Sequence, residues 1–205
     1  MKNQEINTAI TTNINALKES MKSAPEMLNT MQDIAKAVGV VTISGAEFSP
    51  CRKYRYALWR IWDETKPFVM FIGLNPSTAD ESKNDRTIAR VKTISEHNGY
   101  GGFYMMNCFP YISTDPNMLN MMMATIPHSN DAVNDKWLEC AAEMCKTVVF
   151  AWGNFEIVKI LGKNETMQFL FPNAKALHIN KNGSPKHPLY CNANTLFIDY
   201  NPTKK

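Results

Sequence analysis

Phe68-Val-Met-Phe-Ile-Gly-Leu-Asn-Pro-Ser-Thr-Ala-Asp80 decides the fold, because a continuous apolar run breaks here into a short polar segment that favours a turn. Such a run is typical of a buried parallel strand. Ligands of open α/β sheets bind outside the carboxyl ends of the strands, so this loop is a candidate site. The residues concerned are small or polar: Gly73, Asn75, Ser77 and Thr78. The same loop also suits a plain strand-to-helix turn, with backbone freedom at Gly73 and a helix cap at Ser77 or Thr78.

Composition is that of an ordinary globular chain, since 44% of the 205 residues are hydrophobic and 20% are charged. The formal net charge of +3 permits contact with a phosphate backbone without requiring it. No apolar stretch approaches the ~20 residues that span a bilayer, so we expect a cytoplasmic protein with no membrane partner. The five cysteines lack the short spacing of metal sites, so we expect reduced thiols, no metal and no cofactor.

The first forty residues differ in pattern from the rest of the chain. Apolar residues recur at helical spacing before Pro25, and a second helical pattern runs from about 26 to 38 and ends at Gly39. We therefore expect an N-terminal helical extension over 1–40 and an α/β domain over 41–205. The extension could bind a partner or face DNA, although packing onto the main domain is the simpler interpretation.

Two runs before the opening stretch alternate in the way that β-strands do, namely 40–43 and 54–62. The turn-forming segment 63–67 predicts that the second run pairs as a hairpin with the strand that begins at Phe68. Arginines lie beside aromatic residues in this run, an arrangement that can grip a nucleic acid by charge and stacking. A half-buried antiparallel edge explains the same residues equally well.

Helical and strand patterns alternate through the rest of the chain. In chain order they predict a helix over 85–98, a strand over 101–109, a helix over 131–145, a strand over 147–152, a short helix over 155–161 and a strand over 174–179. This alternation predicts an α/β fold with a three-layer α/β/α arrangement around a central four-stranded parallel sheet.

Asn107 is a polar side chain in an otherwise apolar strand, immediately after Met106. A buried amide without hydrogen bonds costs about 1–3 kcal/mol, so Asn107 either ties down neighbouring backbone or faces a ligand. Its place at the end of a strand favours the ligand. The parallel sheet would then bring Asn75, Asn107 and His187 to one edge.

These three stretches resemble, in the same order, the motifs of the uracil-DNA glycosylase superfamily. Gly73-Leu-Asn-Pro-Ser77 is similar to the loop that positions the attacking water, and Asn107 to the residue that reads the flipped base. His187-Pro-Leu-Tyr190 is similar to the last motif, whose His stabilises the departing base. Residues 48–192 also resemble the bacterial and phage DUF1643 family, in the phrases Tyr-Arg-Tyr, Gly-Leu-Asn-Pro-Ser-Thr-Ala-Asp, Ala-Trp-Gly and His-Pro-Leu-Tyr.

The resemblance implies a uracil-DNA glycosylase-like fold and a role for each matching residue. The implied catalytic residues are Asn75 for the water and His187 for the base. An amide cannot take a proton from the water as a carboxylate would, so Asp80 and Asp85 are the candidates for an assisting carboxylate. Asp85 precedes a predicted helix and also suits a plain helix cap. The implied substrate-binding residues are Gly73, Leu74, Pro76, Ser77, Asn107 and Phe109. The implied DNA-binding residues are Ser184, Lys186, Leu189 and Tyr190, with Leu189 or Tyr190 as the wedge.

Two departures from the superfamily pattern affect the expected substrate. Strict uracil enzymes carry a Tyr where this chain has Ser77, which implies room for a substituent at C5 of the pyrimidine. The last motif lacks its usual Ser, so Ser184 and Lys186 are the candidates for the phosphate contact.

We therefore expect a monomeric, monofunctional DNA glycosylase acting on double-stranded or single-stranded DNA. Its expected substrate is a flipped pyrimidine that is mismatched or 5-modified, such as a hydroxymethylated or glucosylated phage base in antiviral defence. Two alternatives stay open: a non-catalytic module that binds a modified base or nucleotide, and a hydrolase or transferase of a free nucleoside derivative.

Overall fold

The computed structural model describes residues 43–115 and 131–202. The predicted N-terminal extension over 1–40 lies outside these ranges, and the boundary proposed at residue 41 stays a prediction. None of the helices in the described ranges is long and apolar enough to cross a membrane.

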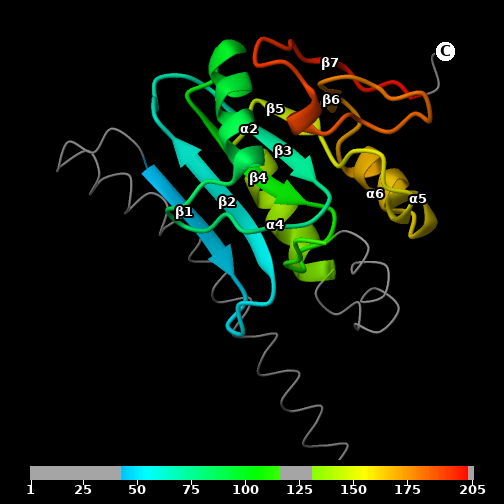
Figure 1. The fold of residues 1–205 in the computed structure, drawn as a ribbon, viewed down its shortest axis with the longest axis horizontal. Coiled ribbons are helices and arrows are strands. Elements are labelled where there is room, and N and C mark those ends of the chain that lie inside the picture. The colour runs from blue at the N-terminus through cyan, green and yellow to red at the C-terminus, as the bar shows by residue number, and fades with distance from the viewer. Residues whose placement is uncertain (1–42, 116–130, 203–205) are drawn as a thin grey trace, which may run out of the picture. The chain divides into compact units, whose positions relative to one another are not determined.

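The described residues form a mixed seven-stranded sheet in the order β1-β2-β4-β3-β5-β6-β7 (Figure 1). The strands are β1 (Ile43–Phe48), β2 (Arg55–Ile61), β3 (Phe68–Gly73), β4 (Gly102–Asn107), β5 (Thr147–Phe150), β6 (Lys175–Ala176) and β7 (Ile198–Asp199). The sheet confirms the α/β class.

A parallel core runs through the middle of this sheet. β3 pairs in parallel with β4, so that Gly73 lies opposite Asn107, and β3 also pairs in parallel with β5. β5 and β6 are parallel as well, whereas β2 pairs antiparallel with β4 and β7 antiparallel with β6. The four central strands β4, β3, β5 and β6 therefore run parallel to one another, and antiparallel strands, which the predicted sheet of four did not include, extend them on both sides to a mixed sheet of seven.

The predicted hairpin between the second and third strands is wrong. β2 pairs with β4 instead, with Leu58 opposite Met105, and β4 lies between β2 and β3. All residues of β4 are buried. A strand that is apolar on both faces gains most from a central position, where both faces are covered.

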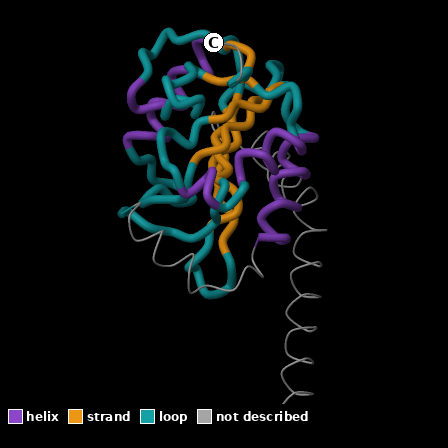
Figure 2. The backbone as a smooth tube through the Cα atoms, turned by 90° about the vertical axis from the view of Figure 1, so that its right-hand side faces the viewer, coloured by secondary structure: helices purple, strands orange, loops and turns teal. Residues whose placement is uncertain are grey.

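The helices are α2 (Arg86–His97), α4 (Asp131–Glu143), α5 (Ile157–Ile160), α6 (Lys163–Leu170) and the short 3₁₀ helix η2 (Pro188–Tyr190). They lie on both sides of the sheet where it is seen nearly edge-on (Figure 2). α2 buries Ile88, Val91 and Ile94, which join the core with residues of β2, β3 and β4. α6 and β7 were not predicted, and the strand predicted over 174–179 is reduced to Lys175–Ala176.

Candidate functional site

A cleft of about 240 Å³ lies beside the carboxyl ends of β3 and β4. Its lining includes Asn75, Asn107 and His187, so the three predicted stretches do come together. Gly73 makes the approach possible. A Cβ at this position would lie 2.6 Å from the Met105 methyl group and 2.9 Å from the Asn107 side chain, so a larger residue would displace these two side chains.

Asn75 holds the loop that follows β4. Its Nδ2 donates to the carbonyls of Ser113 (2.9 Å), Pro76 (3.0 Å) and Tyr111 (3.4 Å). These contacts fix the direction of the amide, and no residue within the described ranges donates to Oδ1. The amide oxygen is therefore the group that Asn75 can offer to a water or ligand in the cleft.

Asn107 is almost fully buried and ties two strand ends together. Its side-chain amide is satisfied when Nδ2 donates to the carbonyls of Met106 (3.2 Å) and Asn75 (3.3 Å). Its own carbonyl accepts a hydrogen bond from Asn134 Nδ2 (2.9 Å). Asn107 thus fixes neighbouring backbone, and it also lines the cleft, while a contact with a ligand stays a prediction.

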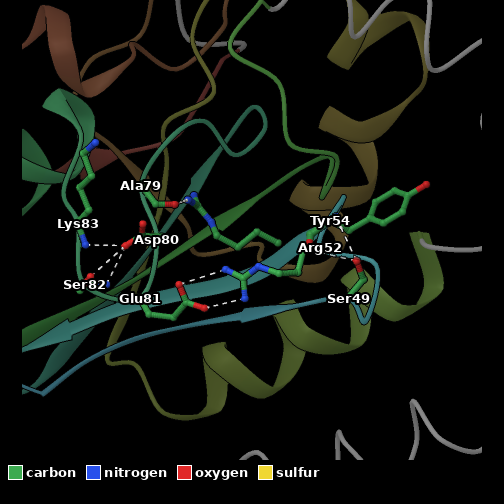
Figure 3. A network of polar contacts seen from close by, with 9 residues as sticks. Ser49, Arg52, Tyr54, Ala79, Asp80, Glu81, Ser82 and Lys83 are labelled. Atoms are coloured by element: carbon green, nitrogen blue, oxygen red, sulfur yellow. Dashed lines mark hydrogen bonds and ion pairs between the residues drawn. The ribbon is translucent and has the colours of Figure 1, made fainter.

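The two candidate carboxylates have different surroundings. Asp85 caps α2, where its Oδ1 accepts a hydrogen bond from the amide of Ile88 (2.9 Å), and it lines the cleft. Asp80 does not line the cleft. Its Oδ1 accepts from the amides of Lys83 (2.7 Å) and Ser82 (2.9 Å), which lowers the pKa of Asp80 (Figure 3). Only Asp85 is therefore placed beside Asn75.

His187 presents one ring nitrogen to the backbone. Its Nδ1 accepts from the amide of Leu189 (3.3 Å), so the neutral ring carries its proton on Nε2. Burial lowers the pKa of His187, and the charge of Asp85 acts in the opposite direction. The ring is therefore a neutral donor at physiological pH.

Gly153 sets the position of the His187 loop. Its φ of +82° belongs to the left-handed region, and its amide donates to the carbonyl of Pro185 (3.0 Å). A Cβ here would lie 3.2 Å from the Cβ of His187. The Ala-Trp-Gly phrase therefore provides the close packing that brings His187 to the cleft.

Four other predicted residues also line the cleft: Leu74, Ser77, Leu189 and Tyr190. Tyr190 is 74% exposed, which leaves its ring available at the surface.

The other predicted residues lie elsewhere. Phe109 is a core residue whose amide donates to the carbonyl of Leu74 (3.0 Å), and Pro76 is buried outside the cleft lining. Ser184 is buried and donates to Asn182 Oδ1 (2.7 Å), so it closes a turn. Lys186 does not line the cleft, and its amide donates to the carbonyl of His178.

Arg55 lines the cleft but was not predicted as a site residue. Because β2 runs antiparallel to β4, its first residue lies beyond the carboxyl end of β4. Its side chain is buried, and its Nη1 donates to the carbonyl of Ala79 (2.6 Å), which Figure 3 labels. The signal available in the sequence was a charged residue at the start of a strand that is otherwise buried on both faces.

Among residues 43–115 and 131–202, no group of three or more His, Cys, Asp or Glu side chains could hold a metal ion. The five cysteines, all within these ranges, are free thiols.

Comparison with known proteins gives a family but no activity. No curated protein and no solved structure matches the chain. The resemblance to glycosylases therefore rests on the short motifs alone. The model of the family described as "Protein of unknown function (DUF1643)" matches residues 55–189, which include Arg55, Asn75, Asp85, Asn107 and His187. The chain belongs to the DUF1643 family.

Proposed function

We propose that the chain is a monofunctional DNA glycosylase that hydrolyses the N-glycosidic bond of a pyrimidine flipped out of DNA. One observation carries the proposal: the same cleft contains an amide oxygen and a carboxylate, from Asn75 and Asp85, together with a neutral imidazole donor from His187. Hydrolysis of an N-glycosidic bond needs acceptors that orient and deprotonate the attacking water, and it needs a hydrogen-bond donor for the departing base.

The chemistry assigns a role to each. As the bond from C1′ to the base nitrogen breaks, the sugar becomes cationic and the base gains negative charge. Asn75 Oδ1 orients a water toward C1′, and the carboxylate oxygen of Asp85 that does not cap α2 accepts the proton that this water loses. His187 Nε2 donates a hydrogen bond to an oxygen of the departing base.

The proposed substrate is a 5-modified or mismatched pyrimidine. Ser77 contributes a small side chain to the cleft, and Phe155 lines both the cleft and a second hollow of about 350 Å³. This neighbouring space supports the proposal that a large C5 substituent, such as a glucosylated hydroxymethyl group, is accepted. Leu189 and the exposed Tyr190 would fill the gap that the flipped base leaves in the stack.

The test is release of free base from DNA. Single-stranded and double-stranded oligonucleotides containing uracil, a thymine mismatch, 5-hydroxymethylcytosine or glucosylated hydroxymethylcytosine are incubated with the full chain. Released bases are identified by mass spectrometry, and abasic sites are detected by alkali cleavage. Release from at least one of these DNAs is expected, and release from none of them contradicts the proposal.

Asp85 and Asp80 provide a matched pair of variants. Asp85→Asn keeps an acceptor for the Ile88 amide but removes the carboxylate from the cleft, so base release should fall by about 10²–10⁴-fold. Asp80→Asn makes the same change in a turn outside the cleft and should leave base release unchanged. Equal effects of the two substitutions would remove Asp85 from the mechanism.

A second candidate function is a module that binds a modified base or nucleotide without cutting it. It is favoured by Asn75, because an amide cannot take a proton from water and its nitrogen is committed to three backbone carbonyls. Tight binding to a modified DNA without any abasic sites would favour this module over the glycosylase.

A further inference from the structure

Arg55 keeps hydrogen-bond donors that the fold does not use. The residue is 3% exposed, and its Nη1 donates to the carbonyl of Ala79. No residue in the described part of the chain accepts a hydrogen bond from Nε or Nη2. Buried arginines ordinarily satisfy their donors, because an uncompensated charge in the interior is costly. The donors of Arg55 that lack acceptors belong to a side chain that lines the cleft.

The charge of Arg55 is not neutralised by an ion pair within the described ranges. No carboxylate oxygen there lies within 4.0 Å of the guanidinium. Burial lowers the pKa of Arg55 to about 10, and the more distant charge of Asp85 opposes this shift. The guanidinium is therefore still a cation at neutral pH.

The amino end of α2 adds donors to the same cleft. Asp85 caps the helix through the amide of Ile88, so the amides of Arg86 and Thr87 have no acceptor within the helix. Thr87 also lines the cleft, where its hydroxyl is a further hydrogen-bonding group. Helix amino ends favour negatively charged ligands, and phosphate groups in particular.

We propose that Arg55, together with the amino end of α2, binds the phosphate of a nucleotide whose base occupies the cleft. The inference rests on the proposed function in placing a nucleotide there, and it extends that function by assigning the phosphate to a residue outside the motifs shared with glycosylases. The phosphate has two possible sources, the terminal group of a free nucleotide or a phosphodiester of DNA.

Asp85 limits how strongly this site holds an anion. Its carboxylate lies at the same helix end and repels a phosphate, while Arg55 attracts it. Removing the charge by Asp85→Asn should therefore tighten phosphate binding, whereas the same substitution weakens base release. Tighter phosphate binding together with weaker base release in this variant would show that Asp85 acts differently on phosphate binding and on the proposed reaction.

The experiment is calorimetric titration of the full chain with four ligands: inorganic phosphate, deoxycytidine, deoxycytidine 5′-monophosphate and an unphosphorylated trinucleotide with central deoxycytidine. The wild-type chain should bind at least one phosphate-bearing nucleoside ligand about 10–100-fold more tightly than deoxycytidine, the range expected of a charge-assisted hydrogen bond. Arg55→Met should lose that gain, and Arg55→Lys should keep part of it. Arg90→Met is the matched control, because Arg90 lies further along the same helix, outside its amino end, and does not line the cleft.

An Arg55-dependent gain with the monophosphate assigns a terminal phosphate, and a gain with the trinucleotide assigns a phosphodiester. Equal affinity of the wild-type chain for deoxycytidine and both phosphate-bearing ligands overturns the proposal, as does an equal loss in Arg55→Met and Arg90→Met. Thermal melting checks that each variant is folded. If Arg55→Met does not fold, the affinity of Arg55→Lys is compared with that of the wild type instead. This titration measures binding and not base release. A failure of the phosphate proposal therefore leaves the glycosylase proposal intact, and a failure of base release leaves the phosphate proposal intact.

Discussion

Strand β2 begins with one buried arginine, Arg55, and carries a second, Arg60, next to its last residue, and the two differ in how their hydrogen-bond donors are satisfied. Arg55 and Arg60 are both 3% exposed. Arg60 donates through Nε to Asn84 Oδ1 (2.9 Å), through Nη1 to the carbonyl of Trp59 (2.8 Å) and through Nη2 to that of Asp80 (2.8 Å). Arg55 donates through Nη1 to Ala79. The two arginines are therefore equally buried but differ in role. Arg60 holds the loop before α2, whereas Arg55 has unused hydrogen-bond donors beside the cleft.

Removing Arg60 should have the largest effect on stability. In Arg60→Met the carbonyls of Gly45, Trp59, Asp80 and Lys83 lose a charged donor, and the loop that positions Asp85 loses its attachment to β2. The free energy of unfolding should fall by about 3–5 kcal/mol, as when a buried polar network is broken. Urea denaturation measures the change. A loss smaller than that of Arg55→Met would contradict the distinction between the two arginines.

Asn75 belongs with Arg60 in one respect, since its nitrogen is fully committed to backbone carbonyls. Asn75→Asp would place a carboxylate oxygen beside the carbonyls of Pro76 and Ser113. We expect a loss of about 1–3 kcal/mol in unfolding free energy and no gain in base release. Asn194→Asp, an exposed change of the same kind, is the control for charge alone.

If Asn75→Asp instead increased base release without loss of stability, the amide would not be needed to hold the loop. The proposed reason for Asn at this position would then be wrong.

Several features of the fold and the cleft could be predicted from the sequence because they depend on local patterns. The run that begins at Phe68 is a buried strand, Asp85 starts a helix, and Asn75, Asn107 and His187 meet at one cleft. Parallel strands bring their carboxyl ends to one edge whichever order they take, so the convergence did not require the correct strand order.

The features that could not be predicted depend on which strands become neighbours. The insertion of β4 between β2 and β3 is a choice among apolar strands that single-sequence patterns do not distinguish. The arginines of the run 54–62 were considered as a possible nucleic-acid contact or as part of a β-strand edge. The position of Arg55 beside the cleft could not be predicted, because it follows from the pairing of β2 with β4. Asp80 and Asp85 look alike in sequence, and only the fold turns one of them away from the cleft.

The pH dependence of stability tests whether His187 is held neutral by its surroundings. Its pKa is lowered in the folded state by burial, so between that pKa and the ordinary value of about 6.5 the unfolded chain binds more protons. The unfolding free energy should therefore be unaffected above pH 6.5 and fall as the pH decreases through this window. His187→Gln should show a shallower fall, and His178→Gln, at an exposed position, should follow the wild type.

Protonation of His187 should also reduce base release at pH values below this window. A protonated Nδ1 cannot accept the hydrogen bond from the Leu189 amide, so the ring loses its orientation. A stability profile of His187→Gln that coincides with the wild type at every pH would show that His187 is not the group responsible.

Removing Arg55 should have the smallest effect on stability, in contrast to Arg60. Arg55→Met deletes one hydrogen bond to Ala79 but also removes a buried cation whose desolvation is not offset by an ion pair with any residue of 43–115 or 131–202. Replacement of a buried charge by an apolar side chain of similar length is often neutral or stabilising, so the change in unfolding free energy should stay within about 1 kcal/mol.

The difference between wild type and Arg55→Met should appear with ligand. Saturating deoxycytidine 5′-monophosphate or the trinucleotide should raise the melting temperature of the wild type, because a ligand that binds only the folded state stabilises it. The melting temperature of Arg55→Met should rise less, because this variant keeps only the affinity that does not depend on the phosphate. A loss of several kcal/mol without ligand would mean that Arg55, like Arg60, serves the fold, and that its unused donors are not kept for a nucleotide.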